Sequence, residues 1–208
     1  PLRAAVEDGF VFFAVCGGYQ LAGHYYRGFD GDELPGAGIL DLHTIHPGPE
    51  AKRFIGNVVA EWNGATLVGF ENHGGRTYLG AGVQPFARMV AGNGNNGDGW
   101  EGAVYRNTFG TYLHGSLLPK NPRFADHLLT LALGRRYSHD VVGGESRSPG
   151  RPSPPRPHPG RADLKGGPYV SPGRLVMLGP LDDAVEKAAH AEALRLSTRR
   201  SIMRMGGR

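Results

Sequence analysis

VFFAVCGGYQLAG, residues 11–23, contains the only cysteine of this 208-residue chain. The apolar run Val11–Val15, rich in β-branched and aromatic residues, is typical of a parallel strand buried on both faces. Two glycines follow Cys16, and Tyr19–Tyr26 can continue as a helix. The order strand, cysteine, glycines and helix is that of a nucleophile elbow, a strained turn that exposes a reactive side chain between a strand and a helix.

An elbow at Cys16 makes three further predictions. Small residues are needed two positions before and after the nucleophile, and these positions hold Ala14 and Gly18. The start of the following helix favours the thiolate form of the cysteine. The backbone N–H of Gly17 could stabilise an oxyanion. The competing interpretation is an inert buried cysteine, because free cysteine is among the most buried residue types.

A thiol nucleophile requires a base, and histidine is the usual one. Two of the nine histidines are expected at the ends of strands, His73 in GFENHGG and His114 in GTYLHGS. The other four that we considered are expected in loops, in the Pro-rich segment and on the last helix: His43, His46, His158 and His190. The spacing of residues does not choose between His73 and His114.

Charge and composition exclude several classes of protein. Residues 1–133 carry 9 Lys and Arg against 12 Asp and Glu, whereas residues 134–208 carry 14 against 7. The basic character therefore belongs to the tail, and the folded part lacks the cations expected of a nucleic-acid surface. One cysteine cannot form an internal disulfide, which favours a reducing, cytosolic setting. The sequence has no apolar run of membrane-spanning length.

The remaining pattern predicts a folded unit followed by less regular segments. Strands are expected at residues 36–42, 54–61, 65–70 and 103–113, a turn at 93–99 and a helix at 122–133. Residues 1–137 would form one domain, 138–176 a Pro/Gly/Arg-rich linker without stable structure, 177–198 a C-terminal helix and 199–208 a tail.

Five motifs together resemble a known family. In chain order they are CGGYQLAG (16–23), GAGILDL (36–42), GFENHGGRTYL (69–79), GNGNNGDGWEGAVYRNTFGTYLHGSLLPKNP (92–122) and PLDDAVEKAAH (180–190). They resemble the glutamine amidotransferase subunits of lipid II isoglutaminyl synthases, within the cobyric-acid-synthase-like class I amidotransferases. The resemblance implies an α/β, flavodoxin-like class I amidotransferase fold, with a mixed sheet, flanking helices and an incomplete N-terminal portion.

The resemblance also implies an activity and a set of site residues. Cys16 would attack the side-chain amide of glutamine and form a thioester, and His114 would act as the general acid and base. Arg53 falls where the family has an arginine that binds glutamine, and Gly17 would supply the oxyanion N–H. No metal or cofactor is expected in this chain.

Released ammonia requires an acceptor, and the chain has no GxxxxGK[ST] loop that could bind ATP. By resemblance, the partner is a Mur-ligase-like subunit that uses ATP and Mg²⁺ and forms a heterodimer with this chain. Together they would amidate the α-carboxyl of D-glutamate in lipid II to D-isoglutamine, in the cytoplasm at the inner face of the membrane. Lipid II would be bound through the partner.

The chain departs from the family pattern in three ways. Ser116 stands where many class I amidotransferases have an acidic residue. Either another group orients His114, with Glu71 and Asn72 as candidates by motif proximity, or the site works as a dyad. Only about ten residues precede the nucleophile strand, so we expect an N-terminally truncated domain. Residues 143–174 are Pro/Arg-rich and unexpected in this family, and either an insertion or a frame-shifted segment would have this composition. Two alternatives stay open: a cobyrinic or cobyric acid amidotransferase domain, and an inactive interaction module.

Overall fold

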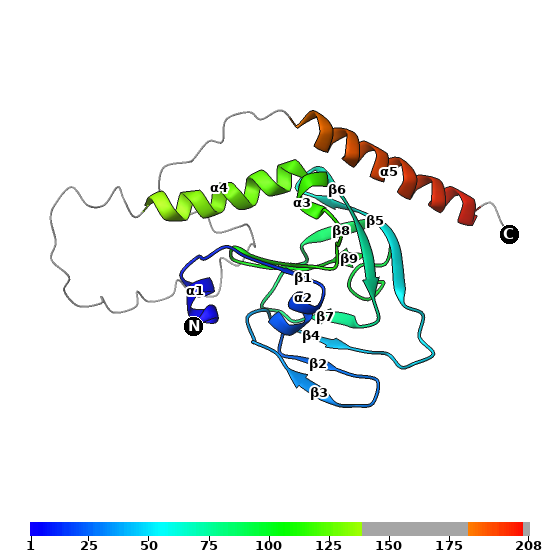
Figure 1. Cartoon of the computed structure of the whole chain (residues 1–208). Coiled ribbons are helices and arrows are strands. Elements are labelled where there is room, and N and C mark those ends of the chain that lie inside the picture. The colour runs from blue at the N-terminus through cyan, green and yellow to red at the C-terminus, as the bar shows by residue number, and fades with distance from the viewer. Residues whose placement is uncertain (139–182, 206–208) are drawn as a thin grey trace.

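The computed structural model describes residues 1–138 and 183–205, with side chains described as far as residue 197. Figure 1 shows a body of short strands with two long helices along one side. In chain order the elements are α1 (Leu2–Glu7), β1 (Phe12–Val15), α2 (Gly17–Ala22), β2 (Tyr25–Arg27), β3 (Glu33–Pro35), β4 (Leu42–Ile45), β5 (Phe54–Trp62), β6 (Ala65–His73), β7 (Arg76–Leu79), β8 (Ala87–Ala91), β9 (Trp100–Glu101), β10 (Ala103–Tyr105), β11 (Thr108–Thr111), α3 (Leu117–Lys120), α4 (Pro122–Ser138) and α5 (Ala184–Met205).

The central sheet joins the two ends of the domain. Its strand order is β1-β11-β10, with β1 parallel to β11 and β10 antiparallel to it. The register pairs Val15 with Thr111, so the chain segments that follow β1 and β11 leave the sheet at the same edge. Carboxyl ends of parallel strands are where open α/β sheets place their functional residues.

Two further sheets surround the central one. One has the order β3-β2-β4-β7 with a parallel pair between β2 and β4, and the other is the antiparallel sheet β6-β5-β8-β9. Isolated bridges join β6 to the segment after β11 at Phe70 and His114, and join Gln84 to Val104 of β10. The antiparallel sheet therefore contacts the central sheet near the edge where β11 ends.

Aromatic side chains fill the main core. Phe124 of α4 lies edge-on to Trp62 and Phe109, with ring centroids 5.2 and 5.6 Å away. Figure 1 shows α4 and α5 on the same side of the body, and α5 makes contacts with α3, β5 and β6. His190 of α5 hydrogen-bonds the carbonyl oxygen of Lys120 at 2.8 Å and so links α5 to the end of α3.

Much of the predicted architecture is confirmed. The strands at 54–61 and 65–70, the turn at 93–99 and the helix beginning at residue 122 are all present. The strand predicted at 11–15 is present over Phe12–Val15, but only Ala14 is fully buried and its other residues are half-buried. The α/β class with mixed sheets and flanking helices is also confirmed. α4 continues to Ser138, five residues beyond the predicted end at 133, because the added residues contain no proline.

Three predicted elements are wrong in part. Residues 36–41 form no strand, because the N–H groups of Ala37 and Ile39 instead bond the carbonyls of Leu21 and Ala22 at the end of α2. The helix predicted over 19–26 therefore ends at Ala22, and 25–27 is a strand. The strand predicted at 103–113 is a hairpin, since Arg106 has φ 53° at the turn between β10 and β11.

The C-terminal helix lies further along the chain than predicted. α5 runs from Ala184 to Met205, past residue 198 and into the predicted tail, because its sequence contains no glycine or proline. The linker predicted at 138–176 lies outside the described residues apart from Ser138, and so do residues 177–182. No helix in the described ranges has the length and apolar character needed to cross a bilayer.

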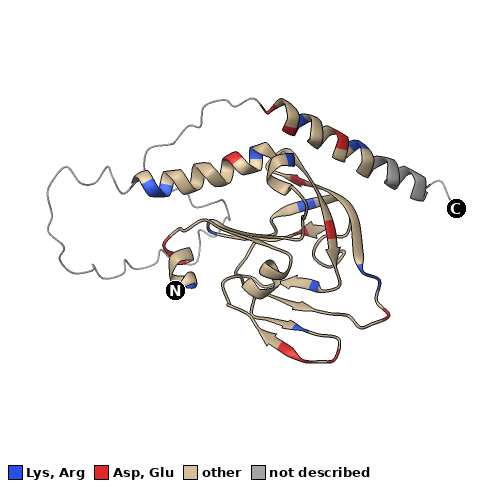
Figure 2. Ribbon diagram, viewed as in Figure 1, with Lys and Arg blue, Asp and Glu red and all other residues tan. Residues whose placement is uncertain are grey.

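Charged residues are spread over the described part of the protein. Figure 2 shows Lys and Arg on separate strands and helices, with Asp and Glu between them. Several form pairs, as Arg88 does with Glu61 and Arg27 does with Glu33, both at 2.6 Å. Charges of both signs are therefore interspersed along the described part of the ribbon.

Candidate active site

Cys16 occupies a strained backbone conformation between β1 and α2. Its φ is 52° and its ψ is −111°, and it is one of four non-glycine residues with positive φ in the described chain. Such a conformation costs an L-residue roughly 1–3 kcal/mol and persists where the surrounding structure enforces it. Here the enforcing contact is the hydrogen bond from the Cys16 N–H to the carbonyl oxygen of Thr111, at 2.8 Å. The elbow geometry expected from the sequence is present.

The glycines after Cys16 leave room around it. A Cβ at Gly17 would have no atom within 4 Å, and Gly17 is the first residue of α2, where backbone N–H groups have no acceptor within the helix. A Cβ at Gly18 would lie 4.0 Å from the Cβ of Ala14, which is ordinary contact. Strand and helix thus approach closely, as expected, although position 18 would accommodate an alanine.

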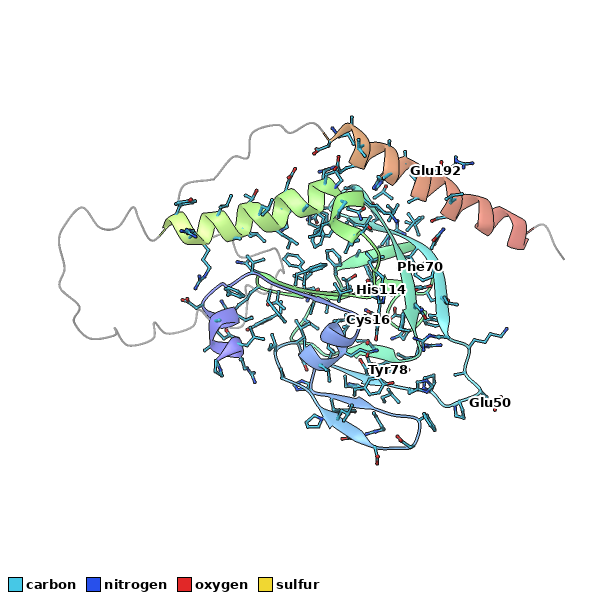
Figure 3. All side chains as sticks on the ribbon, in the orientation of Figure 1. Cys16, Glu50, Phe70, Tyr78, His114 and Glu192 are labelled. Atoms are coloured by element: carbon cyan, nitrogen blue, oxygen red, sulfur yellow. The ribbon has the colours of Figure 1, made fainter. Side chains whose placement is uncertain are left out.

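His114 follows the strand that pairs with β1. Its backbone N–H donates to the carbonyl oxygen of Phe70 at 2.7 Å, and the Phe70 N–H donates back at 3.3 Å. Because β1 and β11 are parallel, His114 and Cys16 both lie beyond the same edge of the central sheet. Figure 3 shows the two residues in the middle of the molecule, where β1 and β11 end.

The environment of His114 favours the neutral imidazole. Partial burial, and secondly the nearby His73, lower the pKa of His114 from its ordinary value. Its buried Nε2 has no hydrogen-bond partner among the described residues. A neutral ring with a nitrogen that makes no hydrogen bond to the protein is what a general base requires.

Arg53 lies beside a glycine pair that also touches α2. Its guanidinium donates to the side-chain oxygen of Asn72 at 2.6 Å and to the carbonyl oxygen of Asn72 at 3.2 Å. A Cβ on Gly74 would lie 3.6 Å from Nη1 of Arg53, and a Cβ on Gly75 would lie 2.9 Å from Nε2 of Gln20. The turn at Gly74–Gly75 therefore separates Arg53 from α2, which begins at Gly17.

The residues considered for orienting His114 have other partners. Glu71 accepts hydrogen bonds from the backbone of Asn93 and Gly94, and Asn72 holds Arg53. None of the described hydrogen bonds joins His114 to Glu71, Asn72 or His73. Burial would raise the pKa of Glu71, but the hydrogen bonds from Asn93 and Gly94 outweigh it and lower the pKa. The Nε2 of His73 is 3.9 Å from Glu71, beyond hydrogen-bond range, so we assign the effect to Asn93 and Gly94.

A buried chain of hydroxyl groups lies beneath the site. The Gln20 side chain donates to the Tyr112 hydroxyl at 3.0 Å, which contacts the Thr77 hydroxyl at 2.7 Å. Thr77 in turn contacts Thr44 at 2.8 Å. The ring of Tyr112 stacks on His73, with centroids 3.5 Å apart. This network of hydrogen bonds links α2, through Gln20, to Tyr112 and Thr77.

Glu101 is a buried carboxyl that sequence reasoning missed. It is 1% exposed, and burial raises its pKa to about 7 against hydrogen bonds that lower it. Its neighbours in the sequence are Trp100 and Gly102, and it falls between the turn predicted at 93–99 and the strand predicted at 103–113. The one feature of the sequence that could have indicated a buried carboxyl is the position of this acidic residue between an apolar residue and a glycine, just before a predicted strand.

In the described ranges, no three His, Cys, Asp or Glu side chains are grouped so that they could hold a metal ion. Among the described residues, the groups at this edge that could react with or bind a substrate are therefore a thiol, an imidazole, backbone N–H groups and a guanidinium. This set can perform covalent acyl transfer on an amide or ester.

Comparison with known proteins gives a consistent result. The profile of the CobB/CobQ-like glutamine amidotransferase domain matches residues 1–122. A protein named lipid II isoglutaminyl synthase (glutamine-hydrolyzing) subunit GatD from Staphylococcus aureus is 46% identical over 138 residues, covering 65% of this chain and 55% of the relative. The protein of the same name from Streptococcus pneumoniae is 39% identical over 139 residues, covering 65% and 53%.

Cobyric acid synthases are more distant relatives. The one from Pelotomaculum thermopropionicum is 36% identical over 149 residues, covering 65% of this chain and 28% of that protein. This chain spans about half the length of the two subunits that it matches at 46% and 39% identity.

Proposed function

We propose that this chain, which belongs to the CobB/CobQ-like glutamine amidotransferase family, hydrolyses L-glutamine and supplies the ammonia to a partner subunit. The observation that carries the proposal is the elbow at Cys16, whose N–H is bonded to the strand that leads to His114. The names of the two relatives at 46% and 39% identity support glutamine hydrolysis in lipid II isoglutaminyl synthesis.

The first half-reaction breaks the amide bond of glutamine. The Cys16 thiolate attacks the side-chain carbonyl carbon, and the Gly17 N–H donates to the oxygen as it becomes negative. His114 takes the thiol proton and gives it to the leaving nitrogen, so that the C–N bond breaks and ammonia departs. The enzyme is left as a γ-glutamyl thioester on Cys16.

The second half-reaction restores the thiol. His114, neutral again, takes a proton from a water molecule as it attacks the thioester carbon. The C–S bond breaks, the sulfur recovers a proton, and glutamate is released. Arg53 would pair with a carboxylate of the substrate, in the fork geometry that suits a guanidinium. Its present partner, Asn72, would hold the guanidinium in place.

The ammonia requires an electrophile that this chain is not proposed to make. We propose that a Mur-ligase-like subunit, with ATP and Mg²⁺, activates the α-carboxyl of D-glutamate in lipid II. Ammonia then forms D-isoglutamine, in the cytoplasm at the inner face of the membrane. The relatives are named as subunits of a lipid II isoglutaminyl synthase, which supports the existence of a partner subunit.

The test is glutamine hydrolysis by the protein with its partner subunit. Cys16→Ala and His114→Ala should each abolish the release of ammonia, whereas Cys16→Ser should retain the fold and little activity. A diazo-ketone analogue of glutamine should label Cys16 selectively. Ammonia release from Cys16→Ala at the wild-type rate would rule the proposal out.

The second candidate is an amidotransferase domain for cobyric acid synthesis, favoured by the 36% identical relative. The two candidates differ in the ammonia acceptor. Amidation of lipid II by the complex supports the first, and amidation of a corrinoid carboxyl supports the second.

A further inference from the structure

Glu101 is the last residue of β9, and its side chain contacts Thr111 and Tyr112, shortly before His114 in the chain. One carboxylate oxygen, Oε1, accepts a hydrogen bond from the hydroxyl of Thr111 and another from the N–H of Tyr112, the latter at 2.8 Å. The Thr111 hydroxyl itself accepts the N–H of Leu113 at 3.0 Å. The backbone N–H groups of residues 112 and 113 therefore both depend on Glu101, directly or through Thr111.

Thr111 is the residue that the two halves of the site share. Its carbonyl oxygen accepts the N–H of Cys16 at 2.8 Å, on the β1 side. Its hydroxyl is held by Glu101 on the other side. Three residues later, His114 is anchored to Phe70 of β6. Any shift of Thr111 would move Cys16 and His114 relative to each other.

We propose that Glu101 is the positioning residue of the Cys16 and His114 pair, acting through Thr111 and the backbone of residues 112 and 113. The inference rests on the proposed glutaminase function. Glu101 touches neither the substrate nor the reacting atoms in this role. It sets the separation of two groups that come from opposite ends of the domain.

A role in stability alone explains Glu101 poorly. Removing a carboxylate from water is unfavourable, and the pKa of Glu101, raised by burial to about 7, reflects that penalty. Its second oxygen, Oε2, is buried with no hydrogen-bond partner among the described residues. A threonine or glutamine could accept the same N–H groups without a buried charge. Perturbed buried carboxyls beside reactive groups are typical of functional sites.

The groups around Glu101 are themselves fixed and polar. Tyr19 has its pKa raised by burial and by the charge of Glu101, and its hydroxyl donates to Asn95. Tyr112 likewise has its pKa raised, to about 12, by burial. Glu71, on β6, is the other described carboxylate that acts on Glu101, and it raises the pKa of Glu101 further. None of these groups is a cation, so Glu101 is held by hydrogen-bond donors alone.

The test uses two pairs of substitutions, in the full chain with its partner subunit. Glu101→Ala and Thr111→Val remove the hydrogen bonds, whereas Glu101→Gln and Thr111→Ser keep an acceptor at 101 and a hydroxyl at 111. Glu61→Ala is the control, because Glu61 is an exposed carboxylate paired with Arg88. Each protein is assayed for kcat and KM with glutamine, and for the pH dependence of Cys16 alkylation by iodoacetamide.

We expect Glu101→Ala and Thr111→Val to lower kcat about 10²-fold, the effect of a misplaced reactive group, with KM changed less than threefold. The alkylation midpoint of Cys16 should move to higher pH in both, since the thiolate loses its aligned imidazole. Glu101→Gln and Thr111→Ser should stay within fivefold of wild type, and Glu61→Ala should be unchanged.

Two outcomes would overturn the proposal. One is wild-type kcat and an unshifted alkylation midpoint in Glu101→Ala or Thr111→Val. The other is an equal loss in the conservative and disruptive members of the pairs. If Glu101→Ala does not fold, the Thr111 pair decides alone. Absence of glutaminase activity in every protein, wild type included, would refute the proposed function, while the alkylation profiles would still test the positioning role.

Discussion

The N–H of Cys16 donates a hydrogen bond to the carbonyl oxygen of Thr111 at 2.8 Å. This bond continues the parallel ladder between β1 and β11 by one residue beyond Val15. It thereby holds Cys16 at positive φ, where the chain turns into α2. The nucleophile is fixed by the same strand that carries the candidate base, so the two cannot be positioned independently.

Replacing Cys16 should separate stability from activity. Cys16→Gly removes a side chain from a backbone with φ 52°, so it should unfold with a free energy about 1 kcal/mol higher than that of Cys16→Ala. Both variants should lose glutamine hydrolysis by at least about 10³-fold. Urea denaturation and ammonia release measure the two effects. Equal stability of the glycine and alanine variants would show that the elbow is unstrained.

The acid limb of the pH–rate profile should lie below the ordinary histidine range. Burial and His73 lower the pKa of His114, so its ring loses its proton at lower pH than a free histidine does. The limb should follow His114, and NMR titration of the ring gives the same midpoint. His73→Phe keeps a ring against Tyr112 and removes the neighbour that lowers the pKa of His114, so the midpoint should rise. A limb near pH 8 would contradict this assignment.

Glu101→Gln should change how stability depends on pH. Glu101 has a folded-state pKa of about 7 against 4.5 for the ordinary group, so the folded protein favours the protonated form. Its stabilising contribution is present below pH 4.5 and is lost as the pH rises to about 7. Relative to wild type, Glu101→Gln should therefore gain up to about 3 kcal/mol between pH 4.5 and 8. Urea denaturation at several pH values measures it, and a pH-independent difference would contradict it.

Arg53 should act on substrate binding. Arg53→Ala should raise KM for glutamine about 10²-fold with kcat changed little, because a carboxylate contact made equally in ground and transition states affects KM. Arg53→Lys should recover only part of the loss, since an ammonium cannot form the paired hydrogen bonds. Arg88→Ala, which breaks an exposed ion pair with Glu61, is the control. An unchanged KM in Arg53→Ala would exclude the role.

Gly75 should tolerate no side chain. A Cβ there would lie 2.6 Å from Cγ2 of Thr44 and 2.9 Å from Nε2 of Gln20, so Gly75→Ala must displace the turn or α2. We expect a loss of about 1–3 kcal/mol in the free energy of unfolding. Gly134→Ala is the matched control, since a Cβ there meets nothing within 4 Å and α4 should gain roughly 0.5–1 kcal/mol. Thermal unfolding of both variants checks the prediction.

Local patterns predicted the elements with strong local signals. The run at 11–15 followed by Cys16 and two glycines predicted the elbow, because each feature depends on a few adjacent residues. The long strands β5 and β6 were equally clear, with Asn63 and Gly64 at positive φ in the turn between them. α4 followed from a proline at its start and apolar residues at helical spacing.

Features that depend on distant contacts could not be predicted this way. Residues 36–40 have the composition of a strand, yet their N–H groups bond the carbonyls at the end of α2. The choice of His114 over His73 needed the family resemblance. The local sequence around each histidine does not indicate which of the two preceding strands pairs with β1, and so which histidine lies near Cys16. The role of His114 stays a prediction. Glu101 was missed because its burial comes from the pairing of β9 with β8 and from the segment after β11.

The parallel ladder between β1 and β11 also has a consequence for how the protein is made. Phe12 pairs with Thr108, so the nucleophile strand finds its neighbour only after most of the domain has been synthesised. Contacts of such high sequence separation form slowly, because a long loop must close first. On the ribosome, Cys16 would emerge before residues 108–114 and would lack its neighbouring strand until they have left the exit tunnel. Reactivity would thus begin only when the domain has closed on itself.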